Sequence, residues 1–178
     1  MYKKIVVIAE MANSHEGKIR KALDIVKAAA NAKADIIKFQ LFTADELLSK
    51  DHPEYKHYQK LSMKESEWHK LVKFAKKKKL KVFFDIFGLK SANLASKFNP
   101  DGYKIHLSDI TNPKILNYFS LTKKPILLST GGSTELEIQN AIDILNKTQK
   151  NITLMHGYQG FPTKINDLNL RRLLELKK

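Results

Sequence analysis

Cysteine is absent from the 178-residue chain. A chain without thiols has no disulfide scaffold, no zinc–thiolate site and no cysteine nucleophile. This composition fits a reducing compartment, and we expect a cytoplasmic protein. Long hydrophobic runs are also missing. The apolar segment at 5–9 ends at Glu10 and is too short for a signal-peptide core or a membrane span, so no membrane association is expected.

Arginine is scarce in a strongly basic chain. The net charge is +14, but 29 of the 32 basic residues are lysine. Proteins that read nucleic acid depend on arginine for bidentate and stacking contacts, so no nucleic-acid partner is expected. A lysine-rich solvated surface explains much of the charge, and small phosphorylated or carboxylated substrates suit it equally well.

Glycine motifs for nucleotides are missing too. The first apolar segment is not followed by Gly-x-Gly-x-x-Gly, and the chain has no Gly-x-x-x-x-Gly-Lys-Ser/Thr loop. A nucleotide-binding fold therefore has no support in the sequence.

What the chain does contain is a repeated unit, in which a short apolar strand is followed by a helix. Strands are predicted at 5–9, 35–39, 81–84, 103–107, 125–128 and 152–155. Continuous apolar runs of this kind are typical of buried parallel strands. They fit an open doubly wound sheet or part of an eight-fold β/α barrel, and both folds place their chemistry at the carboxyl ends of the strands.

The helix boundaries follow from capping signals. Ser62 with Glu65, and Thr134 with Glu137, form two expected capping boxes, each at the start of a helix. Further helices are predicted from about Lys18 and at about 90–97, 113–119 and 166–176. The long connection at 41–61 is expected to be functional, because loops of this length are uncommon in compact domains.

Polar side chains gather at the predicted strand ends. Two of them, Lys38 and Lys104, sit among apolar residues, where a cation is costly unless an anion meets it. Lysines and hydroxyls suit a phosphate or carboxylate ligand, whereas Glu10 and Asp109 could orient a hydroxylated substrate or move protons. The full set is Glu10, Asn13, His15, Lys38, Gln40, Asp85, Lys104, Asp109, Ser129, Thr130, His156 and Gln159.

Plainer explanations exist for these residues. Glu10 could form a structural salt bridge with Lys38 or Lys104, and Asp85 could be only an acid at a helix start. Ser129 and Thr130 could be only helix caps. The histidines near the strand ends are better explained as structural residues than as metal ligands, and no metal ligand is assigned in this chain.

Five segments carry motifs in a consistent order. Residues 8–17 are similar to Ile-Ala-Glu-x-x-x-Asn-His-x-Gly, with a shift near Ser14, and 37–40 match Val-Lys-Phe-Gln. Residues 103–112 are similar to Tyr-Lys-Ile-x-Ser-x-Asp/Glu-x-x-Asn, and 125–131 match Pro-Ile-Ile-Leu-Ser-Thr-Gly. Residues 156–163 are similar to His-Cys-x-x-x-Tyr-Pro-Thr. In these motifs the chain resembles the sialic acid synthases, which include the legionaminate and pseudaminate synthases.

The resemblance implies an α/β fold, a parallel β/α barrel of the TIM type. Residues 1–178 would form one partial barrel domain with about six of the eight units, without the C-terminal antifreeze-like domain of the family. It also implies a reaction in which phosphoenolpyruvate condenses with an N-acylated hexosamine such as N-acetylmannosamine. The enol carbon attacks the sugar aldehyde, water adds to the resulting cation, and phosphate leaves.

The resemblance also assigns roles to individual residues. Lys38, Lys104 and Ser129 would hold phosphoenolpyruvate, and Glu10, Gln40 and Asp109 would act on the sugar. Asn13, Gln159 and Phe161 would be further substrate-binding residues. The family's divalent metal, Mn or Mg, is expected, but the segments that carry its histidine ligands are missing from this chain.

Several positions depart from the family pattern. Asp85 stands where the family has a phosphate-binding threonine, and Leu107 stands where it has a serine. Gln159 and Phe161 replace an asparagine and a tyrosine. We expect the chain to be a fragment of a longer protein, or to be completed by another chain or a homo-oligomer, and to be inactive or weak alone.

Two other functions remain open at this stage. The chain could be a Schiff-base aldolase that uses Lys104 or Lys38, or a degenerate, non-catalytic sugar-phosphate binder. The sequence names neither the sugar substrate nor the oligomeric state.

Overall fold

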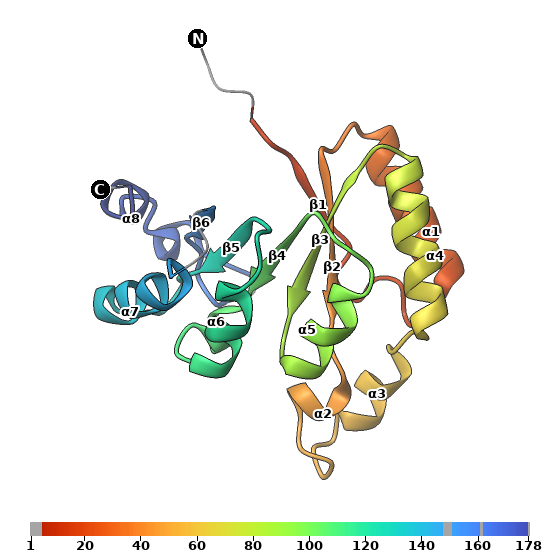
Figure 1. The fold of residues 1–178 in the computed structure, drawn as a ribbon, viewed down its shortest axis with the longest axis horizontal. Coiled ribbons are helices and arrows are strands. Elements are labelled where there is room, and N and C mark those ends of the chain that lie inside the picture. Colours follow the sequence, from red (N-terminus) through yellow and green to blue (C-terminus); the bar gives the residue numbers. More distant parts are fainter. Residues whose placement is uncertain (1–4, 148–150, 161, 178) are drawn as a thin grey trace. The chain divides into compact units, whose positions relative to one another are not determined.

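The computed structural model describes residues 5–147, 151–160 and 162–177. The chain divides into two compact units, Met1–Gly102 and Tyr103–Lys178. Each unit alternates strands with helices (Figure 1), which is the predicted α/β pattern. Within the described residues, no helix combines the length and the apolar composition that a membrane span requires.

Three parallel strands form the sheet of the first unit. They are β1 (Ile8–Glu10), β2 (Ile36–Leu41) and β3 (Lys81–Ile86), with β2 in the middle. The register places Glu10 beside Lys38 and Gln40 beside Asp85. Because the strands are parallel, their polar residues arrive at the same end of the sheet.

Three helices of eight or more residues accompany these strands. They are α1 (Ile19–Asn31), α4 (Glu65–Lys77) and α5 (Leu89–Ser96). Helices α1 and α4 lie side by side (Figure 1). Their buried stripes recur at helical spacing. The buried residues are Ala22, Val26 and Ala29 on α1, and Trp68, Leu71, Val72 and Ala75 on α4.

An aromatic cluster fixes one face of this sheet. Phe39 on β2 and Phe84 on β3 are register partners, with ring centroids 5.6 Å apart, and both contact Trp68 of α4 at 5.9 Å and 5.7 Å. Side chains alternate along a strand. Packing of Phe39 and Phe84 under α4 therefore turns Lys38 and Asp85 to the opposite face.

The second unit repeats the arrangement. Its parallel strands are β4 (Gly102–Ile105), β5 (Ile126–Ser129) and β6 (Ile152–Met155), with β5 in the middle. Its helices are α6 (Pro113–Ser120), α7 (Glu135–Leu145) and the short α8 (Arg172–Glu175). Two 3₁₀ turns, Leu107–Asp109 and Ile165–Leu168, follow β4 and β6.

Side chains cap both longer helices of the second unit. Asn112 accepts from the backbone of Lys114 at 3.2 Å, and Pro113 occupies the first turn of α6. Thr134 and Glu137 form the predicted capping box, in which the Thr134 N–H donates to the Glu137 carboxylate at 2.7 Å. The sequence therefore located the start of α7 correctly.

Several predicted elements were wrong at their ends. The first strand begins at Ile8 rather than at residue 5, because Ile5 and Val6 are exposed and have nothing to pack against. Strand β3 continues past Phe84 to Ile86 and so includes Asp85. Strand β4 stops at Ile105, and after His106 the chain enters the 3₁₀ turn Leu107–Asp109.

Two helix predictions also failed. The Ser62 capping box does not exist: α4 begins at Glu65, and the N–H of its N-cap Lys64 donates to Glu67 at 2.8 Å. The helix predicted at 166–176 is replaced by a 3₁₀ turn and the four-residue α8, with Asn169 in a left-handed conformation between them. The connection at 41–61 contains α2 (Ala44–Leu47) and α3 (Tyr55–Lys60).

Candidate functional site

A buried lysine lies at the centre of the first unit. The Lys38 side chain is only 6% exposed, and its ammonium pairs with two carboxylates, those of Glu10 and Asp85. The distance from Lys38 Nζ to Asp85 Oδ2 is 3.1 Å. Asp85 is 1% exposed, whereas the Glu10 side chain is 40% exposed. The structural salt bridge considered for Glu10 and Lys38 is therefore present.

Asp85 plays a larger part than the sequence suggested. It is a strand residue, so the interpretation as an acid at a helix start is wrong. Its position in the register next to Gln40, two residues after the Lys38 level, brings its carboxylate to the lysine. An acid directly after an apolar run, in a chain with a lysine inside another apolar strand, was the available signal.

The turn after β1 is tightly built. Ala12 has a positive φ of 45°, and its N–H donates to Glu10 Oε1 at 3.1 Å, so the turn holds the Glu10 carboxylate near the strand end. Asn13 lies in the same turn. Its Oδ1 atom is buried and has no hydrogen-bond partner within the described part of the chain. Asn13 thus remains a candidate contact for a polar ligand group.

His15 is a structural residue of this turn. It is 1% exposed, its Nδ1 accepts from the Gly17 N–H at 3.0 Å, and its ring meets the edge of Trp68. Burial lowers the pKa of His15, so the neutral imidazole is favoured. With Trp68 it lines a small cavity of about 90 Å³ that also touches Gln40.

The second unit holds the other predicted carboxylate. Asp109 is 8% exposed, and its Oδ1 accepts from the Asn112 side-chain amide at 2.9 Å. Because Asn112 also caps α6, the helix start fixes the position of the Asp109 side chain. Lys104 on β4 is half-buried, as expected for a lysine within a strand.

Ser129 and Thr130 end β5 in different environments. Ser129 is half-buried, whereas Thr130 is 4% exposed and its hydroxyl donates to the Met155 carbonyl at 3.1 Å. Neither residue caps α7, because Thr134 performs that role. The interpretation of this pair as simple helix caps is therefore wrong.

The loop after β6 contains the last predicted contacts. His156 Nε2 lies 2.9 Å from the Leu168 carbonyl, a structural hydrogen bond. Gln159 is exposed. The prediction for Phe161 lies outside the described residues.

A hollow of about 410 Å³ lies beside the ends of β5 and β6, and sequence reasoning did not foresee it. Thr130, Ser133 and His156 line it together with Tyr158, Asp167, Asn169 and Arg172. The Arg172 guanidinium donates to Glu175 at 2.7 Å and to Glu135 at 3.1 Å, and these bonds raise the pKa of the guanidinium. Arg172 is therefore already balanced by carboxylates.

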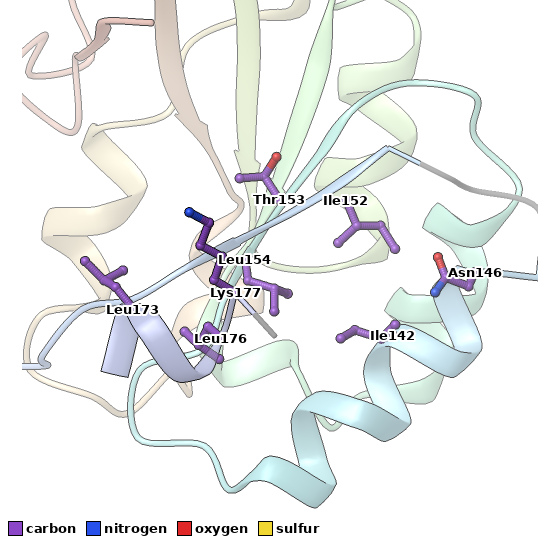
Figure 2. A pocket seen from close by; sticks show the side chains of 8 residues that line it. All are labelled: Ile142, Asn146, Ile152, Thr153, Leu154, Leu173, Leu176 and Lys177. Carbon is purple, nitrogen blue, oxygen red and sulfur yellow. The ribbon is translucent and has the colours of Figure 1, made fainter. Parts of the chain in front are cut away.

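A larger cavity lies away from these polar groups. It has a volume of about 550 Å³ and lies between α7, β6 and α8 (Figure 2). Its lining is mostly aliphatic, and the only charged side chain is Lys177. This lining contains no carboxylate and no histidine, and none of the residues predicted for the site, so the larger cavity is not the candidate site.

A metal site needs several His, Asp or Glu side chains close together. Among residues 5–147, 151–160 and 162–177, no group of three or more His, Asp or Glu side chains is arranged to hold a metal ion. The described residues therefore do not fit a metal centre of the expected kind, and no chemical step is assigned to a metal here.

A family model connects these observations to known proteins. The model of the NeuB family matches residues 25–178, which is most of the chain. The chain belongs to the NeuB family.

Relatives of this NeuB-family chain include a legionaminic acid synthase and a pseudaminic acid synthase. It is 30% identical to the N,N'-diacetyllegionaminic acid synthase of Campylobacter jejuni, over 98% of this chain and 58% of that protein. It is also 30% identical to the pseudaminic acid synthase of the same species, over 99% of this chain and 56% of that protein. The chain thus spans a little more than half the length of these curated relatives.

A solved structure supports the fold. The N-acetylneuraminic acid synthetase of Leptospira borgpetersenii, crystallised with citrate, matches with a TM-score of 0.93 at 26% identity, over 98% of this chain and 61% of that chain. The predicted fold class is confirmed: the NeuB-family chain is an incomplete parallel β/α barrel of the TIM type with six β/α units.

Proposed function

We propose that the chain carries the phosphoenolpyruvate-binding and sugar-binding part of a cytoplasmic nonulosonic acid synthase. The observation that carries the proposal is the family match over residues 25–178, together with Lys38 and its carboxylate partners at the strand ends. The reaction joins C3 of phosphoenolpyruvate to the aldehyde carbon of an N-acylated hexosamine. Water adds to C2, and the C2–O bond to phosphate breaks.

The lysines and Ser129 are proposed to serve phosphoenolpyruvate. Its carboxylate and phosphate need cations and hydroxyl donors, which Lys38 and Lys104 within their strands and Ser129 at the end of β5 can supply. Gln159 and Phe161 are proposed as further contacts from the loop after β6. None of these roles needs a nucleic-acid or membrane partner.

The carboxylates are proposed to serve the sugar. Lys38, Glu10 and Asp85 form a cluster, here called the Lys38 cluster, and Glu10 is its exposed member. It can therefore reach a ligand in solvent and accept or donate a proton at the sugar oxygen. Asp109 is held in place by Asn112 and would orient a sugar hydroxyl. Gln40 and Asn13 supply neutral amide groups for the same substrate.

We propose further that the chain alone is inactive or weak. The family's reaction uses a divalent metal that activates the aldehyde, and the described residues provide no ligand cluster for one. Substrate binding is therefore a more informative readout than turnover for this polypeptide.

The test combines binding with chemical trapping. Isothermal titration calorimetry with phosphoenolpyruvate and with N-acetylmannosamine should show binding of both. Borohydride treatment in the presence of pyruvate should leave the chain unmodified, because a synthase forms no imine. A reduced adduct on Lys38 or Lys104 would favour the aldolase instead, and binding of neither substrate would refute the proposal.

A further inference from the structure

The Lys38 cluster contains more negative than positive charge. One ammonium faces two carboxylates, so the three side chains together carry a net charge of −1. Lys38 and Asp85 are almost fully buried, and water screens their interaction poorly. A phosphate or carboxylate that approaches Lys38 therefore meets a cation whose charge is already compensated.

The two carboxylates differ in their freedom to leave. Glu10 is the last residue of a short strand and is 40% exposed, so it can turn into solvent when a ligand arrives, at the cost of its hydrogen bond from the Ala12 N–H. Asp85 is enclosed within β3, whose neighbouring residues Phe84 and Ile86 are also buried. Glu10 can therefore move away from Lys38 at a lower free-energy cost than Asp85 can, and we expect Asp85 to stay beside Lys38 in the liganded state.

We propose that Asp85 is a specificity-determining residue that limits the affinity of the Lys38 position for anions. The buried carboxylate 3.1 Å from Nζ repels a second anion on the same ammonium, whereas a hydroxyl or carbonyl oxygen meets no such repulsion. Asp85 therefore weakens the binding of phosphate and carboxylate groups at Lys38 without abolishing the contact with phosphoenolpyruvate, and it leaves the binding of uncharged oxygen groups unaffected. The inference rests on the proposed function, because it concerns the same substrate site.

Asp85→Asn is the decisive variant. It keeps the shape and an oxygen acceptor for Lys38 but removes the charge. Dissociation constants for phosphoenolpyruvate, inorganic phosphate and N-acetylmannosamine are measured by calorimetry for the natural chain and the variant. We expect Asp85→Asn to lower the dissociation constants of both anions about tenfold or more, since one charge at this range changes ionic equilibria by about one to three orders of magnitude. The dissociation constant of the neutral sugar should change by less than about twofold.

Asp24→Asn is the matched control, because it removes the same charge from an exposed position on α1. Its anion affinities should stay unchanged. Circular dichroism verifies that each variant is folded, and Asp85→Thr provides a second neutral replacement if Asp85→Asn unfolds.

Each outcome decides the inference. Tighter binding of both anions by the neutral Asp85 variants, and not by Asp24→Asn, supports it. Equal anion affinities, weaker ones, or no anion binding by any folded variant would overturn it. Failure of the proposed function has a different signature, namely a pyruvate adduct after borohydride treatment, or binding of neither phosphoenolpyruvate nor the sugar by the natural chain.

Discussion

Lys38 owes its position to two carboxylates on neighbouring strands. Placing an ammonium and a carboxylate inside a protein costs desolvation energy, which close pairing offsets. The 3.1 Å contact with Asp85 is nearly dry, whereas the contact with Glu10 reaches solvent. We therefore expect the stability of the fold to depend on these three side chains, and we propose that ligand affinity depends on them too.

Removing the lysine should therefore be costly. Lys38→Met leaves the Asp85 carboxylate buried without this ammonium, and we expect the free energy of unfolding in urea to fall by about 3–5 kcal/mol. The double variant Lys38→Met/Asp85→Leu should recover most of that loss. The control Lys97→Met breaks a pair with Glu65 whose partners are 55% and 47% exposed, and it should cost below about 1 kcal/mol. Equal costs for the two single variants would show that the Lys38 pair is not dry.

His15 should make stability depend on pH. Burial lowers its pKa below the ordinary value of 6.5, so the unfolded chain binds a proton at a higher pH than the folded chain does. The contribution of neutral His15 is complete above about pH 6.5 and is lost as the pH falls below that value. Urea unfolding at several pH values should show this loss in the natural chain and less of it in His15→Gln. Parallel profiles for the two proteins would contradict the assignment.

At the residue scale, the sequence predicted that a lysine among apolar residues needs an anionic partner, but it did not decide which carboxylates pair with Lys38. Lys38 and Glu10 stood out because charges in or next to apolar strands need partners. The importance of Asp85 was not evident because the apolar run at 81–84 predicts a strand that ends before it, whereas β3 continues through it to Ile86. Which of several possible partners meets a lysine depends on strand register, and register is not written in one strand alone.

At the scale of single elements, two glycines with positive φ allow the cost of backbone strain to be measured apart from the cost of steric crowding. Gly17 has φ +69°, and an added Cβ would collide with the Lys60 carbonyl at the end of α3, whereas Gly132 has φ +72° and open space. Gly17→Ala should lower the free energy of unfolding by about 2–4 kcal/mol, and Gly132→Ala by about 1–2 kcal/mol. Thermal denaturation of both variants measures the difference. If Gly132→Ala lowers the stability as much as Gly17→Ala does, crowding at Gly17 does not contribute.

Elements with strong local signals were predictable, and those that depend on neighbours were not. Thr134 and Glu137 determine the start of α7 through their own side chains, so the capping pattern was sufficient. Ser62 offered the same pattern but lies outside α4, where Lys64 became the N-cap. The helix expected at 166–176 breaks at Asn169 because a short apolar stretch with few buried contacts lacks the packing that stabilises helices.

The described surface of the second unit has a large apolar component. Leu170, Leu173 and Leu174 are 62%, 48% and 69% exposed, and the aliphatic cavity of Figure 2 lies beside α8. Apolar surface of this kind binds hydrophobic dyes. We expect the chain to enhance the fluorescence of anilinonaphthalene sulfonate, and the double variant Leu173→Lys/Leu174→Lys to lose a large part of that signal while its circular dichroism is unchanged. An unaltered signal would place the dye elsewhere.

For the whole molecule, the repeated units made the fold predictable, because six apolar strands with polar ends indicate parallel β/α architecture. The choice between an open sheet and a barrel needed family motifs, since both folds share that local pattern. The single-domain prediction for residues 1–178 stays a prediction, and the two compact units are each described separately.

The synthase assignment is tested most directly by following phosphoenolpyruvate with ³¹P nuclear magnetic resonance. The purified chain is added at millimolar substrate concentration, together with N-acetylmannosamine and Mg²⁺, which is diamagnetic and does not itself broaden the resonance. The account predicts that the phosphoenolpyruvate resonance broadens or shifts as the chain is added, while inorganic phosphate appears slowly or not at all. A resonance that stays unchanged would contradict the synthase assignment, and rapid, complete release of phosphate would contradict the claim that this chain alone is weak or inactive.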